Sequence, residues 1–332
     1  MRSPLSSPVL FVAAAGPRMG FGHVVRCGVL ARVLAVPRTM VLRGSRRTSA
    51  ACVQMGWRVQ AALPVHSNEH LPALVVVDDP SARSVTKVVK WARARRIPVA
   101  AIRDLGIGAV EADLTIDGSV LQVPVEPPPH LAGSSFAIVD PRLPRVRRPF
   151  AARNGGRVLV ALGGGAHVRR LGVALARELE RRLPGVAVDL APGFGQAPLP
   201  SLNRNARWIA PGDLRGGLRT TRAAVLAGGV TLYEAAALGT PAVAIALTAA
   251  QHSTIRAFAD AGAVIDATGR SDRQSVEKAS IAVCALLGDR HAARRLGRSA
   301  RSLVDGHGAR RVARALTQLM QPSGTRGLAH VA

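Results

Sequence analysis

Short apolar runs alternate along the chain with segments in which apolar residues recur every three or four positions. The runs at 9–15, 74–77 and 99–102 are too short for helices, and glycine, aspartate or arginine follows each, so each indicates a buried strand. Between them, amphipathic segments such as 23–34 predict helices. Strands that alternate with helices predict a mostly parallel sheet covered on both faces.

This alternation is interrupted once and then restarts. The interruption at 141–156 is rich in Pro, Arg and Gly and is the best candidate for a linker. We therefore expect two similar α/β domains, at 1–148 and 149–320, and a frayed tail at 321–332. The remaining predicted strands are 39–42, 113–117, 136–139, 157–162, 186–190, 206–210, 223–227 and 263–266, and the remaining predicted helices are 46–55, 87–96, 168–182, 251–261, two across about 272–304, and 308–320.

The stretch 222–251 holds the clearest local signal for a ligand. Its apolar run ends at the pair Gly228 and Gly229, which allows a tight turn and close approach of a ligand to the backbone. A helix follows, and the free N–H groups at such a helix start suit a phosphate. One alternative is a membrane span, but the apolar pieces are shorter than the ~20 residues that a bilayer requires. The second alternative is an ordinary βαβ unit that binds no ligand.

The helix in this stretch carries recognisable start and stop signals. Thr231 can cap its beginning, and Glu234 stands at the spacing of a capping box. Gly239 ends the helix, and Pro241 begins the next strand.

Composition and charge bear on the partners. The chain has 332 residues, of which 48% are hydrophobic, so it can bury a sizeable core. Its formal net charge of +25 raises the question of nucleic acid. Aromatic residues make up 3%, too few for a stacking platform, and we expect no nucleic-acid partner. A basic surface is also compatible with contact to an acidic substrate or with peripheral contact to a membrane.

Three widely spaced cysteines, at 27, 52 and 284, form neither a disulfide framework nor a metal-binding spacing. They are typical of a reducing compartment, so we expect a cytoplasmic protein without a structural metal. The apolar run at 9–15 has a signal peptide as its alternative interpretation. We favour a first strand, because the run leads directly into a glycine-rich loop.

Residues 20–31, Gly-Phe-Gly-His-Val-Val-Arg-Cys-Gly-Val-Leu-Ala, resemble the signature of the UDP-sugar hydrolases of pseudaminic acid biosynthesis. The second half resembles the same family and its relative, the UDP-N-acetylglucosamine transferase that completes lipid II. The segments that carry this resemblance are 162–165, 227–234, 238–241, Gln251 and 304–309. The resemblance implies a GT-B fold, in which two Rossmann-like doubly wound domains face each other across a cleft and the C-terminal one binds nucleotide.

The resemblance also implies roles for single residues. It makes His23 the catalytic base, and the positive end of a helix dipole favours the neutral imidazole that a base requires. The implied substrate-binding residues are Gly20, Gly22, Arg26, Asp78 and Asp104, and the implied nucleotide-binding residues are Gly163, Gly164, Gly165, Gly228, Gly229, Thr231, Glu234 and Gln251. The alternatives are a structural histidine, a solvated Arg26, and capping roles for the acidic residues and Gln251.

Three departures from the family pattern fall on the sugar side. Ala13–Ala15 stands where the family has Arg-x-Asp, Arg103-Asp104 replaces Asp-Asp, and 136–139 replaces Tyr-x-Leu-Leu. The sugar can therefore differ from the family's. We expect an enzyme without metal or cofactor that hydrolyses a UDP-aminosugar and releases UDP in cell-surface glycan biosynthesis. Glycosyl transfer from a UDP-sugar to an acceptor is the first alternative, and non-enzymatic nucleotide-sugar binding is the second.

Overall fold

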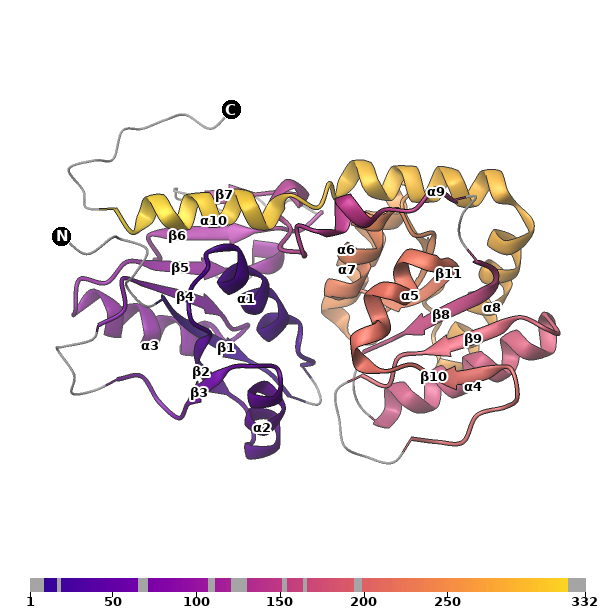
Figure 1. The fold of residues 1–332 in the computed structure, drawn as a ribbon, viewed down its shortest axis with the longest axis horizontal. Helices are drawn as coiled ribbons and strands as arrows, with labels where there is room; N and C mark the ends of the chain where they lie inside the picture. The colour runs from indigo at the N-terminus through magenta and orange to yellow at the C-terminus, as the bar shows by residue number, and fades with distance from the viewer. Residues whose placement is uncertain are drawn as a thin grey trace. The chain divides into compact units, whose positions relative to one another are not determined.

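The computed structural model describes residues 9–16, 19–64, 71–106, 111–120, 130–150, 154–163, 166–193 and 199–321. These residues divide into two compact units, each built on one parallel sheet (Figure 1). Unit 1 comprises the described residues within Met1–Gly16, His23–Ile138 and Gly308–Ala332. Unit 2 comprises those within Pro17–Gly22 and Val139–His307.

The sheet of unit 1 has seven strands in the order β3-β2-β1-β4-β5-β6-β7. The strands are β1 Val9–Ala14, β2 Thr39–Arg43, β3 Arg58–Gln60, β4 Leu74–Asp78, β5 Val99–Ile102, β6 Leu114–Asp117 and β7 His130–Ala132. The α-helices placed with it are α1 Gly22–Val33, α2 Arg46–Gln54, α3 Ala82–Arg93 and α10 Gly308–Leu319. The chain leaves β1 toward β2, then returns to the other side of β1 with β4. Such a reversal is a topological switch point, and right-handed crossovers place α1 and α3 on opposite faces of the sheet.

Alternating strand residues build the core of unit 1. Val75, Val77 and Val99 face α3, which buries Val85 and Val88 against them. The last helix, α10, also belongs to this unit, although its place in the sequence put it in the expected domain 149–320. The Arg311 guanidinium donates to the carbonyl of Ser135 over 2.8 Å, and the apolar face of α10 is buried.

The sheet of unit 2 has six strands in the order β10-β9-β8-β11-β12-β13. The strands are β8 Asn154–Ala161, β9 Ala187–Leu190, β10 Ala206–Trp208, β11 Thr221–Ala227, β12 Ala242–Ile245 and β13 Ile265–Asp266. The α-helices are α4 Ala166–Arg182, α5 Leu214–Thr220, α6 Val230–Leu238, α7 Ala249–Asp260, α8 Asp272–Gly288 and α9 Arg290–Leu303. Leu175 of α4 and Val283 of α8 pack with Val160 and Val225 of the central strands. The switch point of this sheet lies between β8 and β11.

The predicted alternation of strands and helices is confirmed in both units. The predicted strand at 136–139 is wrong: Ser134–Phe136 forms a 3₁₀ turn, and β7 is the strand beside β6 instead. The N–H groups of Phe136 and Ala137 donate to the carbonyls of Gly133 and Ser134, so they cannot join a sheet ladder. In the predicted linker 141–156, Leu143–Val146 is a 3₁₀ turn and 154–156 already belong to β8. No helix in the described part of the chain is long and apolar enough to cross a membrane.

Candidate functional site

The switch point of unit 1 gathers the polar residues of the first half. Ala13 of β1 pairs in register with Asp78 at the end of β4. Helix α1 begins after the loop that follows β1, so it brings His23 and Arg26 to the same carboxyl edge of the sheet. In doubly wound sheets, ligands bind in the crevice at this point.

His23 and Asp78 form a hydrogen-bonded pair. The distance from His23 Nδ1 to Asp78 Oδ1 is 2.7 Å, and the Asp78 side chain is 1% exposed. The 2.7 Å contact of Nδ1 with the carboxylate is shorter than the 3.1 Å contact of Nδ1 with Arg26 NH2, which can only donate. The shorter contact favours the tautomer with the proton on Nδ1, which leaves the lone pair of the neutral ring on Nε2. None of the described residues hydrogen-bonds Nε2, and the His23 side chain is 20% exposed. The ring is therefore oriented with its basic nitrogen available to a ligand.

Arg26 lies one helical turn beyond His23 and joins two carboxylates. Its Nε and NH2 donate to Asp78 over 2.9 and 2.7 Å, and NH1 donates to both oxygens of Asp104 over 2.7 and 2.5 Å. Burial alone would raise the pKa of Asp78, but the charges of Arg26 and His23 lower it to about 2. Burial likewise disfavours the Arg26 cation, yet Asp104 and Asp78 raise its pKa above the usual value. The cluster thus keeps Asp78 ionised.

These contacts separate the expected substrate-binding residues into two groups. Both oxygens of Asp78 and most donors of Arg26 are occupied within the cluster, so both residues orient His23 rather than present free polar groups. The alternative of a solvated Arg26 is wrong, since the residue is 9% exposed, and its expected role in substrate binding stays a prediction. Asp104 has a side chain that is 41% exposed and keeps a face open to a ligand.

Gly20 and Gly22, around the start of α1, differ in conformation. Gly20 has φ +77°, in the left-handed region that favours glycine, whereas Gly22 is the first residue of α1. A second ion pair, not expected from the sequence, lies at the same sheet edge. Arg43, at the end of β2, donates to both oxygens of Asp79 over 2.8 and 2.6 Å. The Asp78-Asp79 pair was the signal for it, because successive strand residues point to opposite faces.

In unit 2 the glycine turns flank the switch point. Ala161 of β8 pairs with Leu226 of β11, and Gly163 and Gly228 each follow two residues later. Gly163 has φ +100°, and a Cβ added there would meet nothing within 4 Å. Gly164 and Gly165 lie outside the described residues. A Cβ on Gly228 would lie 3.0 Å from Gln251 Cβ, so glycine there lets the turn pass close to α7.

The start of α6 differs from the prediction. Gly229, not Thr231, is its N-cap, so the proposed capping box of Thr231 and Glu234 is wrong. Glu234 is 5% exposed, and Arg215 approaches its Oε1 with Nε at 3.2 Å and with NH2 at 3.1 Å. Thr231 is half-buried in the first turn. The predicted end of the helix is confirmed, because Gly239 is its C-cap with φ +65°.

Arg215 also donates to Asp140 over 2.6 Å, which makes a carboxylate–guanidinium–carboxylate chain within unit 2. Burial raises the pKa of Glu234, and the Asp140 charge adds to this effect while Arg215 opposes it. For Asp140, burial is outweighed by Arg142 and Arg215, and its pKa falls to about 2. Asp140 and Arg215 were absent from the sequence-based site, because their pairing spans 75 residues.

Gln251 lies in the first turn of α7, where its Oε1 accepts a hydrogen bond from the Leu247 N–H over 2.8 Å. This bond holds the loop after β12 to the helix, and the amide NH2 remains as a donor. Within the described ranges, no group of three or more His, Cys, Asp or Glu residues is placed to hold a metal ion.

Comparison with known proteins gives a consistent fold. No family model matches the chain. A 54-residue segment, 16% of this chain and 16% of the relative, is 39% identical to the spore coat polysaccharide biosynthesis protein SpsG of Bacillus subtilis (strain 168).

Two groups of solved structures match over nearly the full chain. The spinosyn rhamnosyltransferase SpnG is 17% identical, with a TM-score of 0.61 over 93% of this chain and 100% of that one; its complex with thymidine diphosphate is 19% identical, with a TM-score of 0.60 over 93% and 99%. A putative UDP-N-acetylglucosamine 2-epimerase from Listeria monocytogenes is 12% identical, with a TM-score of 0.57 over 94% and 96%. The expected fold is thereby confirmed, and the chain is an α/β protein of the GT-B fold, with two Rossmann-like parallel-sheet domains.

Proposed function

We propose that the chain is a glycosyltransferase that moves a sugar from a nucleoside diphosphate to an acceptor hydroxyl. The observation that carries this proposal is the His23–Asp78 pair at the switch point of unit 1, with Nε2 free of partners among the described residues. A histidine held in one tautomer by a buried carboxylate is a suitable general base.

The proposed reaction assigns every proton and bond. His23 Nε2 takes the proton of the acceptor hydroxyl as the acceptor oxygen attacks the anomeric carbon. The bond between that carbon and the phosphate oxygen breaks, and the nucleoside diphosphate leaves. Asp78 stabilises the imidazolium that forms, and Arg26 keeps Asp78 ionised. Asp104, with its exposed carboxylate, is proposed to contact a sugar or acceptor hydroxyl.

Unit 2 is proposed to hold the nucleotide. Backbone N–H groups at Gly163–Gly165, Gly228 and Thr231 would bind the pyrophosphate, as helix starts behind glycine turns do. The Gly229 N–H already donates to the carbonyl of Ala227, so Gly229 would shape this turn instead. The Oε2 atom of Glu234 takes no hydrogen bond from the described residues and is left for a ribose hydroxyl. Gln251 would offer its amide NH2 to the sugar or nucleotide. The similar structures include a rhamnosyltransferase complexed with thymidine diphosphate and a putative UDP-N-acetylglucosamine 2-epimerase, which supports either pyrimidine base.

Hydrolysis of a UDP-aminosugar is the second candidate, and the segment 20–27 favours it because it resembles a hydrolase signature. In that reaction His23 would deprotonate water instead of an acceptor. The similar structures are a rhamnosyltransferase and a putative epimerase, and neither is a hydrolase, so transfer is the leading proposal.

The two reactions are separated by their products. The full chain is incubated with UDP- and TDP-sugars, with and without hydroxyl acceptors, and products are followed by mass spectrometry. Acceptor-dependent glycoside supports transfer, whereas acceptor-independent free sugar that carries ¹⁸O from labelled water supports hydrolysis. Nucleotide binding without turnover of any sugar would refute both and favour a binding protein.

A further inference from the structure

Helix α9 has two sharply different faces. Its small residues Ala293, Gly297 and Ala300 are buried at helical spacing. A Cβ added to Gly297 would lie 2.5 Å from the carbonyl oxygen of Gly239, so α9 lies directly on the end of α6. The outward face carries exposed arginines at 290, 294, 295, 298 and 301.

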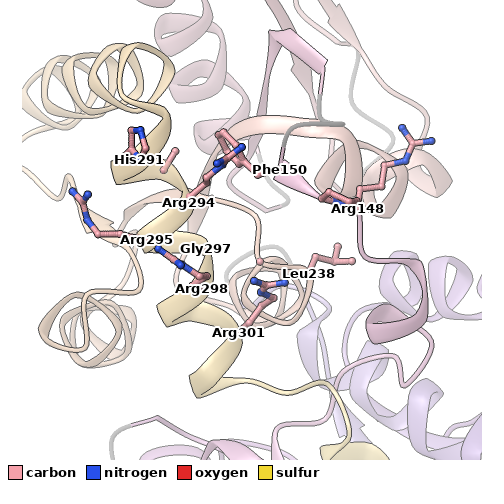
Figure 2. Close-up of a pocket in the computed structure, with 12 residues that line it drawn as sticks. Arg148, Phe150, Leu238, His291, Arg294, Arg295, Gly297, Arg298 and Arg301 are labelled. Atoms are coloured by element: carbon pink, nitrogen blue, oxygen red, sulfur yellow. The ribbon is translucent and has the colours of Figure 1, made fainter.

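Part of this face lines a cavity of about 520 Å³. Figure 2 shows Arg294, Arg298 and Arg301 along α9, with Arg148 on a separate segment and Leu238 and Phe150 between them. None of the twelve lining residues, all in the described part of unit 2, is acidic. We call it the arginine pocket, defined by Arg148, Phe150, Leu238, His291, Arg294, Arg295, Arg298 and Arg301.

Three arginines of this pocket have no ion-pair partner among the described residues, whereas Arg295 lies near enough to Asp289 to lower the pKa of that carboxyl. Within the part of the chain that the structure describes, no carboxylate forms an ion pair with Arg148, Arg294 or Arg298. Two arginines at this pocket or next to it, Arg147 and Arg301, lie close enough for their charges to repel each other. Burial and then the charge of Arg301 lower the pKa of Arg147, the neighbour of Arg148 in the chain, although the charge of Asp305 opposes this shift. Like charges in one concavity repel each other, so a bound anion would relieve the repulsion.

We propose that the arginine pocket binds a compact ligand with two or more linked phosphate groups. Guanidinium forks fit phosphate oxygens in pairs, and α9 offers several of them to the pocket. Arg148 lines the pocket from a separate segment, with its guanidinium directed away from α9 in Figure 2. A single carboxylate would leave most of these charges unmatched, whereas linked phosphates put several charges into a small volume. Both a free polyphosphate and a lipid headgroup with two phosphates carry this chemistry.

Nucleic acid fits the pocket less well. Its one aromatic ring, Phe150, is covered by cations, since the guanidinium carbons of Arg222 and Arg294 lie 5.2 and 5.8 Å from the ring centroid. The ring is therefore not free to stack on a base. The pocket is also distinct from the proposed nucleotide site, because none of the residues proposed to hold the nucleotide lines it.

The test uses the full chain and sodium tripolyphosphate in isothermal titration at about physiological salt. The double variant Arg294→Ser, Arg298→Ser removes two forks, and we expect its affinity to fall at least about tenfold, or about 1.4 kcal/mol, because charge-assisted hydrogen bonds to phosphate are lost. The matched control, Arg83→Ser with Arg314→Ser, removes the same charge from exposed positions on α3 and α10 and should bind like the parent. Arg298→Lys keeps the charge but loses the fork, and an intermediate affinity is expected.

Two further arms identify the source and can overturn the proposal. Vesicles of phosphatidylcholine with and without cardiolipin test the lipid source, and cardiolipin-dependent co-sedimentation that the pocket variant loses would assign it. Citrate tests whether phosphate matters. Binding of citrate as tight as that of tripolyphosphate, equal losses in the pocket and control variants, or binding of neither tripolyphosphate nor cardiolipin vesicles would each overturn the proposal.

Discussion

Replacing Asp78 by Asn tests the central cluster of unit 1. The carboxylate accepts hydrogen bonds from His23 and from two nitrogens of Arg26, and its side chain is 1% exposed. Asparagine keeps the shape but offers one acceptor oxygen and places an NH2 group against cationic or N–H donors. We therefore expect Asp78→Asn to destabilise unit 1 and to leave His23 without its orienting partner.

The magnitude follows from the pKa. Lowering the Asp78 pKa from 3.8 to about 2 corresponds to roughly 2.5 kcal/mol of stability. Because the folded pKa is the lower one, this stability is present above the unfolded pKa and is lost as pH falls through the folded one. It should decline from roughly 2.5 kcal/mol at pH 7 to about half of that at pH 3. Breaking a buried pair can raise the neutral-pH loss to ~3–5 kcal/mol.

The assay is urea unfolding of parent and variants at pH 7 and pH 3. Tryptophan fluorescence suits it, because Trp57 and Trp91 both lie in unit 1. The control is Asp104→Asn, whose 41% exposed carboxylate should be worth less than about 1 kcal/mol. Equal losses in the two variants at pH 7, or a gap between parent and Asp78→Asn that stays the same at pH 3, would refute the reasoning.

Three further outcomes are expected. His23→Ala should lower turnover by roughly 10²- to 10⁴-fold, measured as release of the nucleoside diphosphate, and should keep the affinity for the nucleotide. Unchanged turnover would contradict the role of His23 as the base. Arg215→Ala leaves the buried Glu234 without its cation and should lower the free energy of unfolding in urea by roughly 3–5 kcal/mol. An unchanged free energy of unfolding would show that Arg215 does not stabilise the two carboxylates. Gly239→Ala forces a side chain into φ +65° and should lower stability by at least about 1 kcal/mol in melting experiments. Gly216→Ala lies in open space on α5 and should raise stability by up to about 1 kcal/mol. The reverse order of stabilities would contradict the assigned conformations.

The sequence predicts the doubly wound architecture well, because buried parallel strands such as 74–77 are continuous apolar runs between helical segments. It also places His23 at a helix start and Asp78 at a strand end. Their meeting depends on two elements that are 55 residues apart, so spacing alone cannot show it. Arg26 shows the limit most clearly. An arginine on a helix is usually solvated, and only the three-dimensional contacts with Asp78 and Asp104 account for its burial.

The failures have a shared cause. Glu234 matches a capping box by spacing, but a buried carboxylate is most stable beside a cation, and Arg215 supplies one from another helix. The residues 136–139 have the composition of a strand, yet their N–H groups bond locally and α10 packs against them. In both cases a distant partner decides the local structure, as tertiary context often does with short patterns.

Because α10 belongs to unit 1, truncation of the chain near its C-terminus affects the first domain and not the second. A stop codon just before Gly308 would leave the sequence of unit 2 intact and remove a helix from the first domain. Val312 and Leu316, both 0% exposed, would lose their place there, and apolar surface beneath them would be uncovered. Late truncations should therefore abolish the function of the half that carries His23, and the first domain expressed alone should need the last helix grafted back.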